Sequence, residues 1–398
     1  MIKINLKNRE EIESNHLGAL RDVVKSRINE KRLNTEKGSS LYCFLYYLET
    51  NIDTILCGNR SELERIIKKI EARYYISKRK LSKIVKKREG ELVGRKQIRA
   101  GIMKFIDDNS LSNHLSSKPY SYTNITEFNE EIKSLTSDKW KDYGDILKDI
   151  FNYKEFTTIK EGWSAYTLVN LTEINVCPYC NRSFVTTLMP EEEEAEEIVD
   201  EDVKEKKRTR AVLDHYYAKS LYPYLALSLY NLIPSCYVCN SSFKGEKDFY
   251  KNEAIHPYEE DFLNLVTFKT DFNDTRPYDY RYLLGISKEF KINLEIDKKD
   301  EDLEKKAVQS IETFKLEDLY NTHLDIVRDL IRNGIVNNES RINELCENEN
   351  LKGLFSSREE IIQSLFVNYL KDDDLGKRPF AKLTQDICKE LGLLGPPK

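Results

Sequence analysis

Apolar residues in the first 171 positions recur at intervals of three and four, the period of one buried helix face. The segment "SELERIIKKIEARYY" has apolar side chains at 63, 66, 67, 70 and 74, and it begins with Ser61 and Glu64 at the spacing of a capping box. Further helices are expected near 41–55, 92–108, 126–151 and 159–171. Glycine and proline are scarce in this part of the chain, so we predict a helical N-terminal domain over residues 1–171.

The pattern changes after residue 171. Residues 172–260 contain paired cysteines and an insertion at 190–210, in which nine of the twelve residues 191–202 are acidic. Such a block cannot be buried, so we expect a solvated loop, with an acidic flap over a site as the alternative.

Beyond residue 260, apolar and polar residues alternate in "NLVTFKT", "YDYRYLLG" and "FKINLEI", which predicts short strands. Helical periodicity then returns over the rest of a C-terminal domain at 261–398. One apolar stripe there runs through His323, which we interpret as a core histidine, and Ser357 with Glu360 forms a second capping box. The predicted fold class is therefore α+β, a mostly α-helical chain around a small β-containing core.

Four of the eight cysteines, Cys177, Cys180, Cys236 and Cys239, form two Cys-x-x-Cys pairs. Two thiolates at this spacing can reach one ion, so two pairs predict a tetrahedral structural zinc. All four ligands of that ion are protein groups, and any catalysis must come from other residues. The remaining cysteines, Cys43, Cys57, Cys346 and Cys388, stand alone and are predicted to be buried, inert thiols.

The motifs "CPYC", "LDHYYAKS", "NLIPSC" and "CNSSFK" follow one another between residues 177 and 250. In this order they resemble the zinc-bearing HNH endonucleases, whose pattern is a Cys pair, Asp-His, Asn-Leu, and Cys-x-x-Cys-Asn followed by Lys. "HPYEEDF" and the ending "KRPFAKLTQDICKELGL" are similar to a bacterial subgroup, the HNH effectors of Septu-type and retron-associated anti-phage systems. Those effectors work beside an SMC-like ATPase.

The resemblance implies a ββα-metal core and a role for each matching residue. His215 is the implied general base, since an imidazole can take a proton from water near neutral pH. Asp214 and Asn240 are the implied oxygen ligands of a catalytic Mg²⁺ or Mn²⁺, Asn231 orients the histidine, and Lys244 contacts phosphate.

Two features qualify this scheme. Asp214 and His215 are adjacent, and neighbouring residues of a regular strand point to opposite faces, so both reach one phosphate only if the strand ends or bulges there. His256 is a further candidate metal ligand or phosphate contact, with a turn histidine packed by Pro257 and Tyr258 as the alternative.

The formal net charge of -5 argues against a chain that coats nucleic acid through its overall charge. The segment 78–99, however, holds ten basic and two acidic residues. Within it, Lys86, Lys87 and Arg88 are candidate nucleic-acid contacts, and an ordinary solvated helix face is the alternative. The sequence has neither an apolar run long enough to span a membrane nor a secretory signal, so we expect a cytoplasmic protein.

We therefore expect a metal-dependent HNH endonuclease that cuts DNA and forms a hetero-oligomer with an SMC-like ATPase. The amphipathic helices on both sides of the motif segment are expected to serve as docking surfaces. Two alternatives remain open at this point: a non-catalytic, zinc-stapled nucleic-acid-binding or scaffold protein, and an HNH nuclease that acts on RNA.

Overall fold

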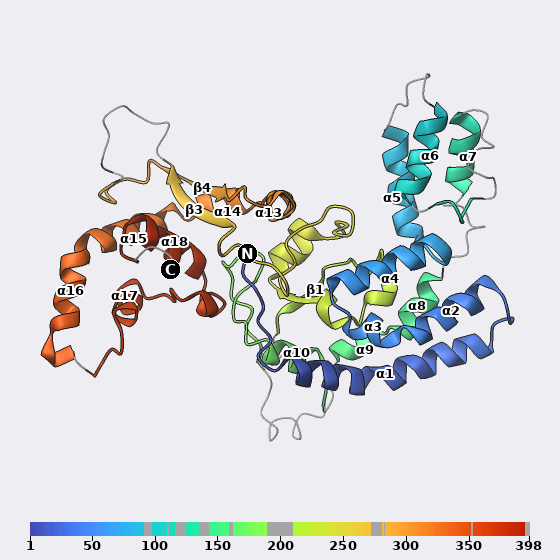
Figure 1. Ribbon diagram of the computed structural model, residues 1–398, viewed down its shortest axis with the longest axis horizontal. Helices are drawn as coiled ribbons and strands as arrows, with labels where there is room; N and C mark the ends of the chain where they lie inside the picture. Colours follow the sequence, from blue (N-terminus) through green and yellow to red (C-terminus); the bar gives the residue numbers. More distant parts are fainter. Residues whose placement is uncertain are drawn as a thin grey trace, which may run out of the picture.

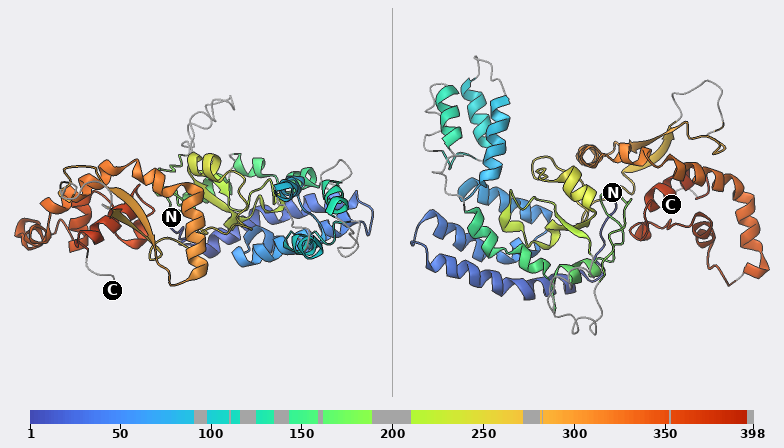
Figure 2. Two further views of the ribbon diagram at one scale, coloured as in Figure 1. Left: turned by 90° about the horizontal axis from the view of Figure 1, so that it is seen from above. Right: turned by 180° about the vertical axis from the view of Figure 1, so that it is seen from behind.

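A computed structural model of the chain describes residues 1–90, 98–109, 111–115, 125–134, 143–158, 162–188, 210–271, 281, 283–351 and 353–394. The molecule is mostly helical with two small antiparallel sheets, an α+β fold. It is elongated: the N-terminal helices lie at one end, the C-terminal helices at the other, and β1 lies between them (Figure 1). Seen from above, it is flat (Figure 2).

The N-terminal part is built from short amphipathic helices around the long helix α1. These are α1 (Arg9–Leu33), α2 (Ser40–Thr50), α3 (Ile52–Cys57), α4 (Arg60–Arg73), α5 (Lys78–Gly90), α6 (Ile98–Asp108), α7 (Ile125–Ser134), α8 (Gly144–Ile150), α9 (Tyr153–Thr157) and α10 (Ala165–Leu171). Helix α4 begins two residues earlier than predicted. Its capping box joins Asn59 to Glu62, and the Ser61 hydroxyl donates to the Asn59 side chain instead of capping the helix.

Helices α5, α6 and α7 form an arm that projects from the rest of the molecule (Figures 1 and 2). They enclose a small apolar cluster of their own, made of Ile76, Leu81, Ile84, Ile102, Ile106, Leu111 and Phe128. Lys80 connects this arm to the central part, because its buried ammonium contacts both Glu71 and the Tyr222 hydroxyl. The three predicted domains otherwise share one continuous apolar core.

The central part holds a hairpin followed by a short helix. Strand β1 (Val212–His215) pairs antiparallel with β2 (Leu232–Ser235), with Asp214 opposite Ile233 and His215 opposite Leu232. Two 3₁₀ turns, η3 (Pro223–Leu225) and η4 (Leu229–Asn231), lie between the strands, and the π-helical turn η5 (Val238–Lys244) follows β2.

The first residues of the chain pass through this central region as an extended strap. The Ile2 amide donates to the Pro178 carbonyl at 2.9 Å, the Ile4 amide donates to Pro257 at 2.7 Å, and the Met1 carbonyl accepts from Phe262 at 3.1 Å. The side chains of Ile2 and Ile4 are buried. The strap therefore joins segments that are far apart in the sequence.

The C-terminal part begins with β3 (Val266–Asp271) and β4 (Lys291–Ile296), an antiparallel pair that confirms two of the three predicted strands. The described residues of the third, Arg281 and 283–285, form turns, and the remainder lies outside the described residues. The helical elements that follow are α13 (Glu301–Phe314), α14 (Leu316–Asn321), α15 (Leu324–Val336), α16 (Glu339–Glu347), η6 (Glu349–Leu351), α17 (Arg358–Phe366), η7 (Asp372–Asp374) and α18 (Ala381–Glu390).

The predicted long stripe through His323 is two helices, because α14 ends at Asn321 and His323 is the residue that precedes α15. The His323 ring packs against Phe380 and accepts a hydrogen bond from Arg182, so its polar group is satisfied. The residue is half-buried, so the prediction that it belongs to the core is wrong. Ser357 caps α17 as predicted, while the Glu360 carboxylate accepts from the Ser356 amide. Among the described residues, no helix combines the length and apolarity needed to cross a bilayer.

Asn181 joins the first cysteine pair to the C-terminal helices. Its side chain donates to the Leu375 carbonyl at 2.9 Å and accepts from the Lys382 amide at 3.1 Å. It thereby satisfies one of the free amides at the start of α18, where Phe380 offers no side-chain cap. Its positive φ of 50° also suits asparagine better than most residues.

We predict that Asn181→Ala lowers the free energy of unfolding by about 2 to 4 kcal/mol, because it leaves a buried carbonyl and a buried amide unpaired. Urea denaturation of the variant measures the change. Asn264→Ala, which alters an exposed asparagine, is the control and should stay within about 0.5 kcal/mol of the unaltered chain. Equal stabilities of the two variants would contradict the assigned role of Asn181.

Candidate functional site

The four predicted zinc ligands lie together at the centre of the molecule. Sulfur atoms of Cys177, Cys180, Cys236 and Cys239 are all within 4.8 Å of one another. The Cys180 and Cys236 sulfurs are 4.0 Å apart. A tetrahedral zinc with Zn–S bonds of about 2.3 Å requires sulfur separations of about 3.8 Å. The cluster can therefore hold a metal ion such as zinc.

The local backbone places these sulfurs by hydrogen bonding. Between Cys177 and Phe184 the chain makes a tight turn, in which the Cys177 amide donates to Ser183 at 2.9 Å and the Asn181 amide donates to Cys177 at 2.8 Å. In the second pair, the Cys239 amide points at the Cys236 sulfur at 3.5 Å. Burial raises the pKa of the Cys177 thiol. A bound cation would offset that cost, since metal ligation favours the thiolate.

The other four cysteines lie apart from the cluster. The prediction of burial holds for Cys388 and is wrong for Cys43 and Cys346, which are exposed, while Cys57 is half-buried. Isolated cysteines on amphipathic helices face either side of the helix, and their spacing does not reveal which.

His215 ends strand β1 with its ring at the edge of a cavity. The ring is only 6% exposed and packs edge-on against Tyr153 of α9, with centroids 4.6 Å apart. Nε2 lies 3.0 Å from the Ala226 carbonyl oxygen. Because a carbonyl only accepts, Nε2 carries the proton and Nδ1 keeps its lone pair in the neutral ring. Burial, reinforced by the charges of Lys219 and Lys244, lowers the pKa of His215 to about 3, so this neutral form is present at pH 7.

The loop that holds His215 is fixed through three successive carbonyls. The Leu225 carbonyl accepts from the side-chain amide of Asn231 at 2.9 Å. The Ala226 carbonyl contacts Nε2 of His215, and the Leu227 carbonyl contacts Nε2 of His16 at 2.7 Å. Asn231 is fully buried and also accepts from the Tyr217 amide at 2.6 Å. Asn231 therefore fixes the loop whose Ala226 carbonyl contacts the histidine.

Asp214 is held apart from the cavity. Its carboxylate accepts from the Tyr179 hydroxyl at 2.7 Å and from Lys244 at 3.2 Å, and all three residues are buried. Strand β1 is regular up to His215, so the two adjacent side chains point to opposite faces of the hairpin.

Lys244 differs from its predicted role as a phosphate contact. Its side chain is 0% exposed, and its ammonium also donates to the His215 carbonyl at 2.6 Å. Buried between a carboxylate and a carbonyl, it secures the end of β1 and is shielded from solvent. A buried lysine needs such partners, and Asp214 supplies the opposite charge.

One cavity of about 540 Å³ contains two of the predicted catalytic residues, His215 and Asn240. Its other lining residues are Tyr153, Tyr166, Arg210, Ala211, Val212, Leu213 and Lys219. None of these carries a carboxylate, whereas Arg210 and Lys219 are cations. The cavity therefore combines a neutral imidazole with an excess of positive charge, an environment suited to an anionic substrate.

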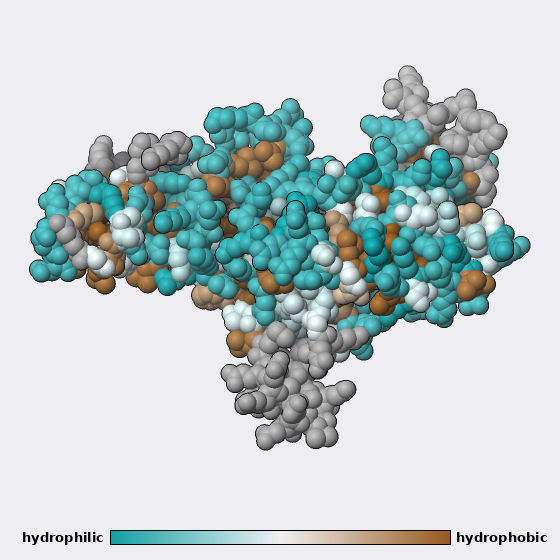
Figure 3. Space-filling view, turned by 60° about the horizontal axis from the view of Figure 1, so that its bottom comes forward, coloured by the Kyte–Doolittle hydropathy of each residue, from teal (hydrophilic) through white to brown (hydrophobic). Residues whose placement is uncertain are grey.

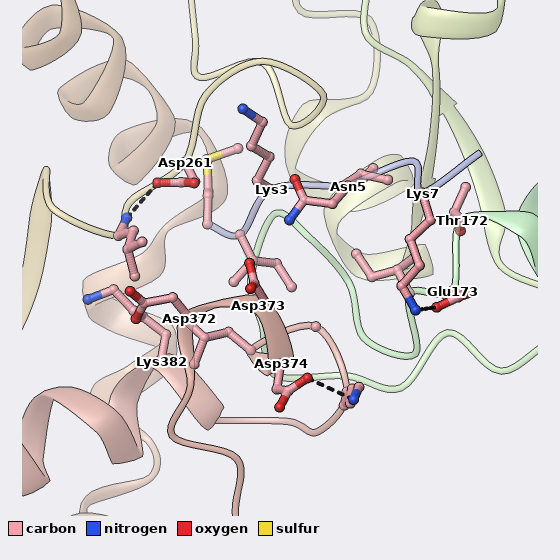
Figure 4. Close-up of a pocket in the computed structure, with 18 residues that line it drawn as sticks. Lys3, Asn5, Lys7, Thr172, Glu173, Asp261, Asp372, Asp373, Asp374 and Lys382 are labelled. Atoms are coloured by element: carbon pink, nitrogen blue, oxygen red, sulfur yellow. Dashed lines mark hydrogen bonds and ion pairs between the residues drawn. The ribbon is translucent and has the colours of Figure 1, made fainter. Parts of the chain in front are cut away.

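Two other cavities lack this chemistry. One, of about 570 Å³, lies where the N-terminal strap meets the C-terminal part. Figure 4 shows the acidic Asp372, Asp373 and Asp374 on one side of it and Lys3 on the other. The second, of about 760 Å³, lies beside α5, and two of its lysines, Lys80 and Lys83, are paired with carboxylates.

His256 and the basic segment 78–99 belong neither to the four-cysteine cluster nor to the cavity beside His215. The His256 ring is fully buried against Tyr216, with centroids 4.3 Å apart, and it lines none of the three cavities. This placement fits the packed turn histidine. In the basic segment, Arg79 pairs with Glu246 at 2.6 Å, so part of its charge is neutralised. The side chains of Lys86, Lys87 and Arg88, and the acidic insertion at 190–209, lie outside what the structure describes.

Sequence reasoning missed Tyr153, Tyr166, Arg210, Lys219 and His16, which complete the cavity or support its loop. All but Lys219 lie outside the motif segments, so spacing gave no signal for them. Lys219 lies within "LDHYYAKS", and its positive charge close to His215 in the sequence could have identified it as a candidate.

Comparison with known proteins adds no relative to this picture. No protein-family model matches the chain, and neither a curated protein nor a solved structure matches it. The resemblance to HNH endonucleases stays a prediction that rests on the residues themselves.

We predict one zinc per chain, measured by inductively coupled plasma mass spectrometry on protein purified without added metal. Cys239→Ser should lose the ion and unfold at a lower temperature, because metal binding closes the segment between the two cysteine pairs. Cys43→Ser removes an exposed thiol and should retain one zinc and the original melting temperature. Well-folded protein without zinc would overturn the assignment.

Proposed function

We propose that this chain is an HNH-type endonuclease that hydrolyses phosphodiester bonds in DNA. The observation that carries the proposal is His215, whose Nε2 is tied to a backbone carbonyl while the ring borders a cationic cavity with no carboxylate among its described lining residues. This arrangement fixes one tautomer and leaves Nδ1 with a lone pair, as a general base requires. The order of the Asp, His and Asn motifs in the sequence supports the same conclusion.

In the proposed step, His215 removes a proton from a water molecule. The water oxygen attacks phosphorus, the bond from phosphorus to the 3′ oxygen breaks, and that oxygen takes a proton from solvent. The products are a 5′-phosphate and a 3′-hydroxyl. Asn231 contributes by holding the loop whose Ala226 carbonyl fixes the imidazole.

The implied catalytic Mg²⁺ or Mn²⁺ does not fit the described geometry. The Asp214 carboxylate already accepts hydrogen bonds from Tyr179 and Lys244, and Asp214 does not line the cavity that contains Asn240 and His215. One amide oxygen without a carboxylate is a poor site for a hard divalent ion. The four-cysteine cluster, whose ligands are all protein sulfurs, is assigned a structural role.

We predict that His215→Gln abolishes cleavage while preserving the fold, since the glutamine amide can still donate to Ala226 but has no basic nitrogen that can take a proton from water. Plasmid, linear DNA and RNA are incubated with the protein in Mg²⁺, in Mn²⁺ and in EDTA. His323→Gln, which alters a histidine far from the cavity, is the control and should cleave normally.

Cleavage by His215→Gln at the unaltered rate would exclude His215 as the base. If the unaltered chain binds DNA and cuts neither DNA nor RNA under any condition, the non-catalytic scaffold is the correct reading. Cleavage of RNA alone would keep the mechanism and change the substrate.

We also propose that the chain works in a hetero-oligomer with an SMC-like ATPase. Apolar side chains are exposed in the C-terminal part, with Val336 72%, Leu354 66% and Val367 71% accessible. Apolar patches interrupt the hydrophilic surface at that end of the molecule (Figure 3). Exposed apolar groups of this kind favour docking to a protein partner. The net charge of -5 is consistent with a nuclease that leaves DNA capture to its partner.

Co-expression with an SMC-like ATPase encoded beside it is expected to give a stable complex by size-exclusion chromatography with light scattering. Replacing Val336 and Val367 together by Asp should weaken the complex, because each adds a charge to the apolar surface. The exposed Lys68→Asp, on α4, is the matched control. Strong plasmid cleavage by the lone chain, with no co-elution, would contradict this arrangement.

A further inference from the structure

The cavity beside His215 holds two cations that have no acidic partner. Neither Arg210 nor Lys219 makes an ion pair within the described ranges, and no lining residue of the cavity is acidic. Elsewhere among the described residues, buried or half-buried cations such as Arg60 and Lys306 each contact several carboxylates. Among the described residues, these two cations leave a local positive charge around the cavity that an incoming anion can neutralise.

Aromatic rings, not carboxylates, position these cations. The Arg210 guanidinium lies 5.4 Å from the centre of the Tyr166 ring, and the Lys219 ammonium lies 4.4 Å from that of Tyr153. A ring face attracts a cation without cancelling its charge, so each cation stays available to a ligand. Tyr153 also packs against His215, and this contact connects the lysine to the proposed base.

The support for the cations comes from outside the motif segment. Tyr153 belongs to α9 and Tyr166 to α10, both in the N-terminal helical part. Arg210 lies two residues before the start of β1, and Lys219 lies four residues after its end. The helices thus complete one wall of a cavity whose other wall is the hairpin.

We propose that Arg210 and Lys219 form a phosphate clamp that holds the backbone of a nucleic-acid strand against His215, with Tyr166 and Tyr153 as the positioning residues of the two cations. This proposal rests on the proposed nuclease function for its ligand class. Because the clamp recognises phosphate, it acts equally on DNA and RNA, and it contributes charge rather than base specificity.

The test measures binding separately from cleavage. A fluorescein-labelled 20-nucleotide single-stranded DNA and an RNA of the same sequence are titrated in EDTA against the full-length His215→Gln chain, and anisotropy is followed across salt concentrations. Arg210→Gln and Lys219→Gln are introduced singly and together into this background. Lys68→Gln removes an exposed charge of α4, outside the cavity, and is the matched control.

Each cavity variant is expected to weaken binding of both strands and to reduce the slope of log affinity against log salt by about 0.7. The double variant should lose about twice that slope, while Lys68→Gln should match the parent. Tyr166→Leu should weaken binding as Arg210→Gln does, whereas Tyr166→Phe, which keeps the ring, should not.

A double variant with the salt slope and affinity of Lys68→Gln would overturn the clamp. A loss of affinity confined to the DNA strand or to the RNA strand would overturn it as well. Zinc content and melting temperature identify variants that fail to fold, and Arg210→Met and Lys219→Met, which also remove the charge, then replace them. The outcomes separate the two proposals. Salt-dependent binding through the clamp, without any hydrolysis by the chain that retains His215, refutes the nuclease alone. Hydrolysis by that chain, with binding that does not depend on Arg210 and Lys219, refutes the clamp alone.

Discussion

The convergence of four sulfur atoms is the constraint on which the central structure depends. Residues 181–235 separate the two cysteine pairs, a span of 55 residues that loses much conformational freedom when its ends meet. Each pair then places other groups: Tyr179, inside the first, reaches Asp214, and η5, which starts within the second, carries Asn240 and Lys244. A metal bound by the sulfurs therefore fixes both ends of the hairpin at once.

The hairpin separates two kinds of chemistry by its alternation. Asp214 faces the cysteine side and forms a buried, neutralised pair with Lys244, whereas His215 faces the cationic cavity. One strand thus carries a structural charge and the proposed base on successive residues. The cost of burying Asp214 and Lys244 is offset by their mutual attraction and by the hydrogen bonds from Tyr179 and to the His215 carbonyl.

Local spacing allowed much of this arrangement to be predicted, and distant contacts account for the rest. The Cys-x-x-Cys pairs indicated the four-sulfur cluster because both ligands of a pair lie within one turn of chain. The roles of Lys244 and Asp214 were harder to predict, because the exposure of their side chains depends on contacts with Tyr179 and Phe249 and not on their neighbours in sequence. Tyr153 and Tyr166 had no signal, because a ring that faces a cation from another element follows no fixed spacing. The start of α4 was misplaced by two residues, since Asn59 and Ser61 are both good caps and only the fold chooses between them.

The buried strap at Ile2 and Ile4 has a consequence for synthesis on the ribosome. These residues emerge early, but their backbone partners Pro178 and Pro257 are made some 175 and 250 residues later. At a translation rate of about 5 to 20 residues per second, the apolar strap remains without these partners for on the order of tens of seconds. Helices α1 to α4 have local partners and can pack during this interval. The central core closes only after translation has passed its last strap partner, Phe262, so the beginning of the chain is among the last parts to reach its native place.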